Sequence, residues 1–302
     1  MAKLALLFPG QGAQTLGMGK DLANQLSASR EVFSKADEIL GYSLSELCFE
    51  GPEATLHHTN RSQPALFVHS IAALEKLKAE MPAIFDDIAF TAGLSLGEYT
   101  AMAVAGSLSF EDCLRVVQCR GDAMQASSDL VESGMASVLG METEAVEQVC
   151  IDAREEGEVL QVANYLCPGN IAISGHNSAI ERASQLASER GAFRVVRLKV
   201  AGAFHTELMR PAVPLLESAL AKASLVPPQI PVVSNVDANI HSSPDELKKI
   251  LVSQVCSPVY WEQSIRFMVE QGVEKFYEVG TGTTLKGILK RIDRSIPCEN
   301  IG

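Results

Sequence analysis

The sequence predicts an α/β fold in which helices cover a mostly parallel sheet, with a second, smaller α/β unit inserted into the chain. Near both ends of the chain, short apolar segments alternate with segments whose apolar residues have helical spacing. In the middle this alternation changes, and two strands follow one another directly. A chain of 302 residues, 47% apolar and 21% charged, is long enough to bury the core of such a globular fold.

The first and last parts of the chain supply the larger domain, predicted to comprise residues 1–126 and 201–302. Its expected strands are residues 4–8, 88–92, 231–234 and 275–279. Its expected helices are residues 30–40, 64–79, 98–105, 110–125, 206–223, 245–255, 261–271 and 284–292. The short, almost continuous apolar runs are typical of parallel strands that are buried on both faces.

The middle part is predicted to be an inserted domain of residues 127–200. Its expected strands are residues 136–139, 159–163, 170–174 and 193–200, and its expected helices are residues 143–155 and 177–190. Asn177 or Ser178 is the expected N-cap of the second helix. The resulting order, β-α-β-β-α-β, is that of a ferredoxin-like unit.

Composition excludes several classes of function. A net charge of −12 argues against a nucleic-acid-binding protein, because phosphate contacts need clustered Lys and Arg. Polar residues interrupt the least charged long stretch, so no membrane span is expected, and the apolar run at residues 4–8 is too short for a signal peptide.

The seven cysteines are widely spaced and form no C-x-x-C pair, so the sequence indicates neither a zinc site nor a disulfide framework. We therefore expect reduced thiols, no metal site, no cofactor and a cytoplasmic protein. The alternative location is an organelle matrix or stroma, after removal of a transit peptide.

The segment Gly93-Leu94-Ser95-Leu96-Gly97 fits the pattern G-x-S-x-G. Small residues two positions away on each side of a serine allow a sharp strand-to-helix turn, which lifts the hydroxyl out of the sheet. The segment follows a predicted buried strand and opens a predicted helix, as this geometry requires. We interpret Ser95 as a nucleophile; the alternative is a serine that caps the helix.

A serine nucleophile needs a base, and His205 is the best placed of six histidines. It follows a predicted strand and a short turn, and loops at strand ends are where catalytic groups of open α/β sheets gather. No aspartate between Ser95 and His205 is well placed as a third member. We therefore expect a Ser–His dyad whose imidazole is oriented by a backbone carbonyl.

An oxyanion hole needs two backbone N–H groups. One is expected from Leu96, the residue after the nucleophile, and the other from the loop at residues 9–12, whose glycines allow close approach. This loop lacks the third glycine of a dinucleotide fingerprint and has no Walker lysine, which argues against nucleotide binding.

Arg120 lies in the predicted helix at residues 110–125, just after the helix that the serine turn opens. On position alone, a surface or salt-bridged arginine is the favoured interpretation. The alternative is a clamp on a substrate carboxylate, which a guanidinium binds through two parallel hydrogen bonds.

Several segments together resemble the malonyl-CoA:acyl-carrier-protein transacylases and the acyltransferase domains of fatty acid and polyketide synthases. These segments are Phe8-Pro9-Gly10-Gln11-Gly12, Gly93-Leu94-Ser95-Leu96-Gly97-Glu98-Tyr99, Arg120-Gly121-Asp122-Ala123-Met124-Gln125, Gly202-Ala203-Phe204-His205-Thr206, Gln254-Val255-Cys256-Ser257-Pro258-Val259-Tyr260-Trp261 and Glu278-Val279-Gly280. The resemblance runs from residue 4 to about residue 292. It implies an α/β-hydrolase-like large domain with a ferredoxin-like insert.

The resemblance also implies a reaction. Malonyl-CoA donates its malonyl group to Ser95 as an ester, and the phosphopantetheine thiol of acyl carrier protein then accepts it, which supplies fatty acid elongation. His205 acts first as base and then as acid, while the N–H groups of Gln11 and Leu96 hold the oxyanion. A monomer that needs no cofactor is expected.

The same resemblance assigns four substrate-side residues. Arg120 pairs with the free malonyl carboxylate, and the main-chain carbonyl of Gln254 orients His205. The ring of Phe204 crowds an α-methyl branch, which disfavours methylmalonyl. Asn164 lies in a segment that contacts substrate or pantetheine.

Three positions depart from the family pattern. Leu94 stands beside the nucleophile where many members have a histidine, and its side chain cannot hydrogen-bond. Leu166 and Asn170 stand where a related segment often carries Asn and Gln.

Acyl carrier protein is acidic in this family, so a local basic patch is expected to bind it. The candidate residues are Arg194, Arg197, Lys199, Lys286, Lys290, Arg291 and Arg294. Ordinary solvated charges are the alternative for each of them.

Two other functions compete with the transferase. A serine esterase or thioesterase would share Ser95 and His205 but would not need the carboxylate clamp of Arg120. A module that only binds a carrier protein would need none of the three residues.

Overall fold

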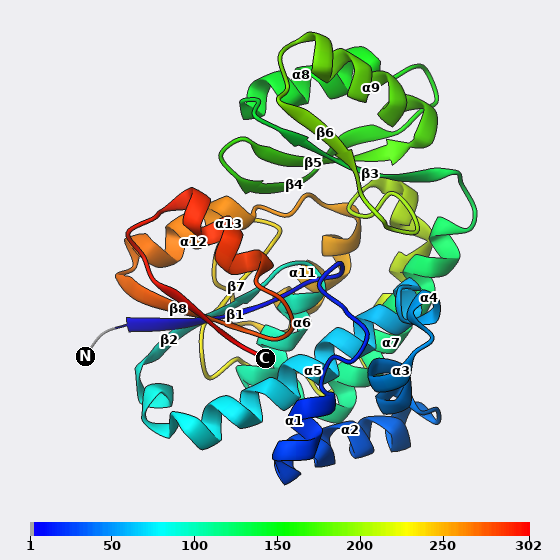
Figure 1. Cartoon of the computed structure of the whole chain (residues 1–302). Helices are drawn as coiled ribbons and strands as arrows, with labels where there is room; N and C mark the ends of the chain where they lie inside the picture. The colour runs from blue at the N-terminus through cyan, green and yellow to red at the C-terminus, as the bar shows by residue number, and fades with distance from the viewer. Residues whose placement is uncertain (1–2) are drawn as a thin grey trace.

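The computed structural model describes residues 3–302 and contains two separate sheets (Figure 1). The five-stranded sheet has the order β7-β2-β1-β8-β9, and all its neighbouring strands are parallel. Its strands are β1 (Lys3–Phe8), β2 (Ile88–Gly93), β7 (Val232–Val233), β8 (Val273–Val279) and β9 (Cys298–Ile301).

Helices cover both faces of this sheet. The α-helices of the larger part are α1 (Lys20–Gln25), α2 (Ser27–Leu40), α3 (Leu44–Glu50), α4 (Glu53–Leu56), α5 (Thr59–Glu80), α6 (Leu96–Val104), α7 (Phe110–Ser128), α10 (Val213–Lys222), α11 (Pro244–Ser253), α12 (Trp261–Glu270) and α13 (Thr284–Ile292). Its 3-10 helices are η1 (Pro82–Asp87), η2 (Glu207–Ala212) and η3 (Gln254–Cys256).

The apolar run of β1 is divided between two cores, because successive strand residues point to opposite faces of a sheet. Leu4, Leu6 and Phe8 pack in the core that contains residues of α5, α6 and α7, whereas Ala5 and Leu7 pack with residues of α12 and α13. Burial on both faces explains why this strand reads as a continuous apolar segment.

The second sheet is antiparallel and has the order β4-β5-β3-β6. It consists of β3 (Ser133–Leu139), β4 (Leu160–Cys167), β5 (Asn170–His176) and β6 (Arg194–Arg197), and it packs with α8 (Thr143–Ala153) and α9 (Asn177–Glu189) around a core of its own. In Figure 1 this unit lies above the larger sheet. The chain order and the antiparallel pairing are those of a ferredoxin-like unit.

The predicted fold class, an α/β protein with a parallel sheet and a separate antiparallel unit, is therefore confirmed. The elements of the second sheet fall within the predicted insert of residues 127–200, and α7 continues to Ser128, past the predicted boundary at residue 126. The exact division into domains 1–126 plus 201–302 and 127–200 stays a prediction.

Several element predictions need correction. The helix expected at residues 206–223 is divided into η2 and α10, because Pro211 and Pro214 have no N–H to donate to the preceding turn. The strand expected at residues 193–200 is shorter, at Arg194–Arg197, and the helix expected at residues 245–255 ends as α11 at Ser253.

The N-cap prediction for α9 is wrong. His176 occupies the N-cap position without a side-chain capping bond, while Asn177 accepts a hydrogen bond from Arg197 and the Ser178 hydroxyl donates to Glu158. The sequence analysis also missed α1, α3, α4, η1 and β9, which are short or begin without a distinct signal.

Candidate active site

Ser95 lies at the turn between β2 and α6, in a backbone conformation with φ 52° and ψ −100°. A Cβ on Gly93 would lie 1.9 Å from the carbonyl carbon of Gly97, and a Cβ on Gly97 would lie 2.1 Å from the carbonyl oxygen of Phe8. Neither position can hold a side chain unless the backbone moves. The turn thus requires both glycines of the G-x-S-x-G pattern, as the sequence predicted.

His205 lies against the serine. Its Nε2 is 2.8 Å from Ser95 Oγ, and its Nδ1 is 2.9 Å from the carbonyl oxygen of Gln254 and 3.1 Å from that of Ser257. Two carbonyl acceptors at Nδ1 require the ring proton there, which leaves Nε2 as the acceptor for the serine hydroxyl. The arrangement is a Ser–His pair oriented by backbone carbonyls, without a third carboxylate on the ring.

The environment keeps His205 neutral. The ring is buried, and burial together with the positive charge of Arg120 lowers its pKa from 6.5 to about 4. The two carbonyl hydrogen bonds oppose this shift only in part. At neutral pH the imidazole is therefore free to accept a proton from Ser95.

Arg120, on α7, is 1% exposed and points at the nucleophile. Its Nη1 donates to Gln63 Oε1 at 2.7 Å, and its Nη2 donates to Ser95 Oγ at 3.0 Å and to Gln254 Oε1 at 2.9 Å. All three acceptors are neutral, and Nε has no hydrogen-bond partner within residues 3–302. Three of the five guanidinium N–H groups are thus used, and two remain.

A buried cation without a bound carboxylate is costly unless an anion occupies the site. Burial lowers the pKa of Arg120, against the smaller opposing effects of Tyr99 and Glu98. The interpretation of Arg120 as a surface or salt-bridged residue is therefore wrong. Its remaining donors and its charge suit an anionic group held close to Ser95.

Gln254 connects these groups. Its amide nitrogen donates to the carbonyl of Ser95 at 3.0 Å and to Glu98 Oε2 at 2.5 Å, while its amide oxygen accepts from Arg120. Its own carbonyl is the one that orients His205. One buried glutamine thus contacts the nucleophile, the base and the cation.

The two backbone N–H groups expected at the oxyanion site are free of acceptors within the described part of the chain. Leu96 is the first residue of α6, so its N–H has no acceptor inside the helix. Gly10, beside Gln11, packs so tightly on the serine turn that a Cβ would lie 2.4 Å from the carbonyl oxygen of Leu94. The loop at residues 9–12 therefore approaches the turn closely, through Gly10.

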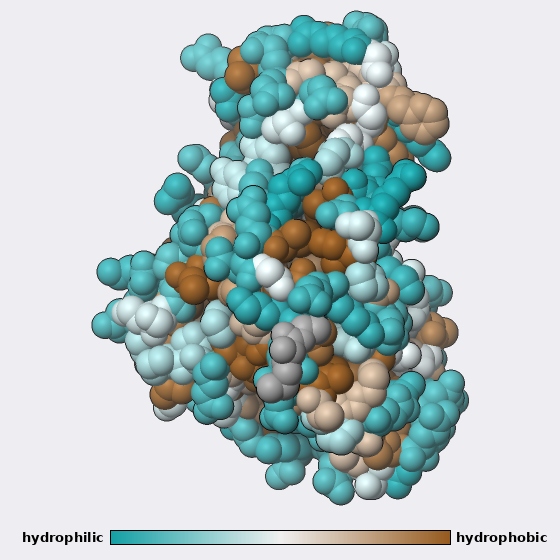
Figure 2. All heavy atoms as spheres, turned by 90° about the vertical axis from the view of Figure 1, so that its left-hand side faces the viewer, coloured by the Kyte–Doolittle hydropathy of each residue, from teal (hydrophilic) through white to brown (hydrophobic). Residues whose placement is uncertain are grey.

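A cavity of about 220 Å³ opens beside Ser95 and is lined by residues of both parts of the molecule. Its lining includes Gln11, Ser95, Arg120, Asn164, Phe204 and His205, and the apolar side chains Leu94, Leu166, Leu198 and Ile288. Figure 2 shows hydrophobic atoms in a recess between the upper, smaller part and the larger part below it. A larger groove of about 660 Å³ beside α10 and α11 is lined by none of Ser95, His205 and Arg120.

Two wall residues have distinct properties. Phe204 is 5% exposed, and its ring forms part of the apolar wall. Asn164 is also buried, and its Oδ1 has no hydrogen-bond partner within residues 3–302, so it can accept from a bound molecule. Leu94 and Leu166, which depart from the family pattern, line the same cavity, whereas Asn170 accepts a hydrogen bond from Ser137.

The other five histidines lie elsewhere. His69 is buried in α5, His58 precedes α5, and His57 contacts Gln14. His176 contacts the backbone at Val159, and His241 contacts Asp237 and Glu246.

Three further polar residues of the site were missed by the sequence analysis: Gln63, Glu98 and Asn235. Asn235 follows β7 and is fully buried, and its Oδ1 accepts from the Ser95 N–H at 2.7 Å. Its position two residues after the end of a parallel strand is the signal that could have identified it. Glu98 is buried beside the turn, and burial raises its pKa to about 7.

Residues 3–302 contain no group of three or more His, Cys, Asp or Glu side chains arranged to hold a metal ion. No helix in the same range is both long and apolar enough to cross a membrane.

Comparisons with known proteins identify the family of the chain. Residues 5–297 match the model of the acyl transferase domain family. The chain is 45% identical to the malonyl CoA-acyl carrier protein transacylase of Bacillus subtilis, over 98% of this chain and 92% of that protein. It is 42% identical to the human mitochondrial malonyl-CoA-acyl carrier protein transacylase, over 94% of this chain and 76% of that protein.

Solved structures agree as well. An acyl carrier protein S-malonyltransferase from Vibrio cholerae superposes with a TM-score of 0.93 at 38% identity, covering 100% of this chain and 97% of that one. A malonyl-transacylase in complex with a type II polyketide-synthase acyl-carrier protein superposes with a TM-score of 0.95 at 34% identity, covering 99% and 96%. The chain belongs to the acyl transferase family, among the malonyl-CoA-acyl carrier protein transacylases.

Proposed function

We propose that this protein transfers the malonyl group of malonyl-CoA to the phosphopantetheine thiol of acyl carrier protein, through an ester on Ser95, for fatty acid chain elongation. The observation that carries the proposal is the buried Arg120, whose Nη2 lies 3.0 Å from Ser95 Oγ and whose hydrogen bonds all go to neutral groups. A malonyl thioester is the acyl donor that brings a free carboxylate to such a cation.

In the first half-reaction, Ser95 Oγ attacks the thioester carbonyl while His205 Nε2 takes the hydroxyl proton. The N–H groups of Gln11 and Leu96 stabilise the oxyanion of the tetrahedral intermediate. When the intermediate collapses, the C–S bond breaks and coenzyme A leaves as a thiol with the proton from His205. The product of this step is a malonyl ester on Ser95.

In the second half-reaction, the thiol of acyl carrier protein attacks the ester carbonyl and His205 takes the thiol proton. Collapse returns that proton to Ser95 Oγ and releases malonyl-carrier protein, so the cycle is ping-pong. Leu94 and Leu166 give the cavity an apolar wall, which leaves few polar groups to position a competing water.

The cavity also supports selection of the acyl group. The Phe204 ring is held in the wall beside His205, so an α-methyl branch on the substrate would meet it. Methylmalonyl-CoA should therefore have a lower kcat/KM than malonyl-CoA, and similar values for the two thioesters would contradict this role of Phe204. Asn164 is assigned a hydrogen bond to substrate or pantetheine through its free Oδ1.

Acyl carrier protein is proposed to bind the basic residues near the junction of the two sheets. Arg291 on α13 contacts the turn between β4 and β5, where its Nη2 donates to the carbonyl oxygens of Pro168 and Gly169. The other candidates are Arg194, Arg197, Lys199, Lys286, Lys290 and Arg294. A steep loss of carrier affinity with added salt is expected.

Intact-mass measurement after mixing with malonyl-CoA tests the proposal directly. The wild type should gain one malonyl group, Ser95→Ala none, and Arg120→Ala much less. Addition of acyl carrier protein should then remove the adduct from the wild type and malonylate the carrier. Rapid release of free malonate without an adduct would favour a hydrolase, and neither adduct nor turnover would favour a binding module.

A further inference from the structure

Asn235 holds the serine turn from outside the substrate cavity. Its side-chain Oδ1 accepts from the Ser95 N–H at 2.7 Å, and its Nδ2 donates to the carbonyl oxygen of Gly93 at 2.8 Å. The residue is fully buried and does not line the cavity beside Ser95. One amide therefore joins the last residue of β2 to the nucleophile, with a donor and an acceptor each matched to its partner.

Ser95 is a residue that needs such support. Its φ of 52° and ψ of −100° lie outside the regions that residues with a Cβ adopt readily. Such conformations persist only where the surrounding structure imposes them. Without the bond to its N–H, the turn could relax and carry Oγ away from its position 2.8 Å from His205 Nε2.

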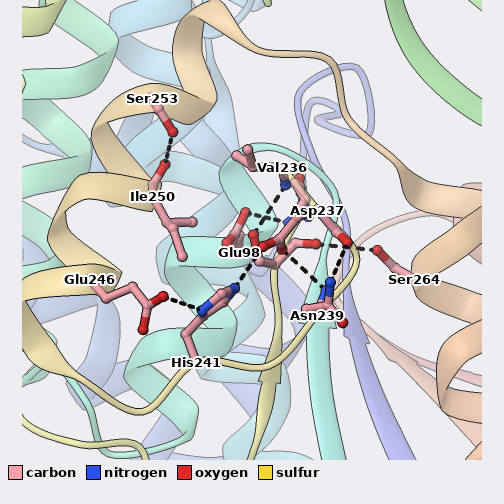
Figure 3. A network of polar contacts seen from close by, with 11 residues as sticks. Glu98, Val236, Asp237, Asn239, His241, Glu246, Ile250, Ser253 and Ser264 are labelled. Carbon is pink, nitrogen blue, oxygen red and sulfur yellow. Dashed lines mark hydrogen bonds and ion pairs between the residues drawn. The ribbon is translucent and has the colours of Figure 1, made fainter.

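The loop that carries Asn235 is itself fixed. The N–H of Asn235 donates to Glu98 Oε2 at 3.2 Å, and its carbonyl accepts from the Tyr260 N–H at 2.8 Å. Figure 3 shows how the loop continues: His241 lies between Asp237 and Glu246, at 2.9 and 3.0 Å.

The same loop is closed by contacts among its own residues. Within it, the Ala238 N–H donates to the Ser234 carbonyl and the Val236 N–H donates to the Ser234 hydroxyl. These hydrogen bonds hold the backbone of Asn235 in a fixed position relative to the serine turn.

We propose that Asn235 is a positioning residue that holds Ser95 in its attacking conformation, and that it does so without contacting the substrate. The proposal rests on Ser95 being the nucleophile of the proposed function. It predicts an effect on the rate of serine acylation and not on the affinity for malonyl-CoA. A purely structural role would instead lower stability and leave the rate constant of the folded protein unchanged.

Two variants separate these roles. Asn235→Ala removes both hydrogen bonds and should lower the rate constant of Ser95 acylation about 10- to 100-fold, as expected for a displaced reacting group. Binding of malonyl-CoA to the Ser95→Ala background should be unchanged by Asn235→Ala. Asn239→Ala is the matched control in the same loop, because the one hydrogen bond of the Asn239 side chain within residues 3–302 goes to the Asp237 carbonyl, and it should acylate at the wild-type rate.

Asn235→Asp should give a pH dependence of the acylation rate that a loss of stability alone would not produce. One carboxyl oxygen can still accept from the Ser95 N–H, but the other faces the Gly93 carbonyl and can bond to it only when protonated. The ratio of its acylation rate to that of the wild type should therefore rise as pH falls from about 8 to about 5. Glu98, Asp237, His241 and Glu246 also lie on or around this loop, so Asn235→Ala serves as the non-titrating reference.

Acylation is measured with malonyl-CoA and, in parallel, with a fluorophosphonate that labels nucleophilic serines. Slow reaction of Asn235→Ala with both reagents, and a pH-dependent ratio for Asn235→Asp alone, is the expected result. Wild-type rates in Asn235→Ala, or equal pH profiles for the two variants, would overturn the proposal. If the wild type reacts with the fluorophosphonate but not with malonyl-CoA, the proposed function fails while the fluorophosphonate rates still decide the role of Asn235.

Discussion

Arg120→Ala is the change that most directly tests how the site selects its substrate. The side chain is buried, and two of its five N–H groups have no acceptor among the described residues. Two hydrogen bonds from a cation to a carboxylate contribute about 1.5–3 kcal/mol each. A carboxylate that bonds to both Nη1 and Nη2 must displace Ser95 or Gln254 from Nη2, which offsets part of this free energy. A net loss of about 3–4 kcal/mol corresponds to a fall in kcat/KM for malonyl-CoA of about 10²- to 10³-fold.

The comparison substrate is acetyl-CoA, which carries the same thioester but no carboxylate. Its kcat/KM should change by less than about tenfold in Arg120→Ala, so the preference for malonyl should shrink by about two orders of magnitude. Intact mass and single-turnover rates with both thioesters provide the measurement. Arg115→Ala is the matched control on α7, because Arg115 is exposed and pairs with Asp112.

An equal loss of activity with both thioesters would refute this reasoning. It would mean that Arg120 acts on the nucleophile through its bond to Ser95, or on the fold, and not on the substrate carboxylate. A second readout is independent of substrate. Arg120 lowers the pKa of His205, so the acidic limb of the pH–rate profile should move to higher pH in Arg120→Ala.

Three further predictions concern titration and packing. Because the pKa of His205 is lowered to about 4, wild-type kcat/KM should stay flat from pH 8 to about 5 and fall to half near pH 4; a midpoint near 6.5 would contradict this. Burial raises the pKa of Glu98 from 4.5 to about 7, so the folded state favours the protonated form. The free energy of unfolding therefore has its full contribution from this group below pH 4.5, where Glu98 is protonated in both states. About 3 kcal/mol of this contribution is lost as pH rises through 7. Denaturant titrations should show that loss in the wild type and not in Glu98→Gln, whereas parallel curves would count against it. Gly97→Ala should lower the free energy of unfolding by about 3 kcal/mol, because its Cβ would lie 2.1 Å from the backbone of Phe8. Gly287→Ala, with nothing within 4 Å of its Cβ, should be neutral or stabilising, and equal effects of the two changes would rule out the steric explanation.

The sequence was most informative where chemistry and local backbone geometry coincide. Ser95 could be predicted because the glycines at 93 and 97 are required by contacts within the turn itself and with β1. His205 could be selected because a loop after a strand is a common place for a catalytic group. The alternation of strands and helices predicted the fold class for a similar reason, since periodicity is a local property.

What could not be predicted depends on contacts between distant segments. Asn235 lies 140 positions from Ser95, and Gln63 lies 57 positions from Arg120. Gln63 has no local signal for its role, and the position of Asn235 near the end of a strand does not by itself indicate that its side chain contacts Ser95. Arg120 shows the same limit, because on position alone it resembled a surface residue, and only the packing around α7 shows that it is buried beside the serine.

The charges of the site explain why the buried groups depend on one another. The side-chain amide of Gln254 lies between Glu98 and Arg120, because its nitrogen donates to the carboxyl and its oxygen accepts from the guanidinium. A direct Glu98–Arg120 ion pair would neutralise the cation and occupy its donors. With Gln254 between them, the positive charge of Arg120 stays available at Ser95, where it adds to the effect of burial in lowering the pKa of His205. Burial raises the pKa of Glu98, and the hydrogen bonds from Gln254 and Asn235 oppose that rise only in part. The proposed substrate carboxylate would then complete the charge balance in the cavity, which ties binding of malonyl to the arrangement of the catalytic pair.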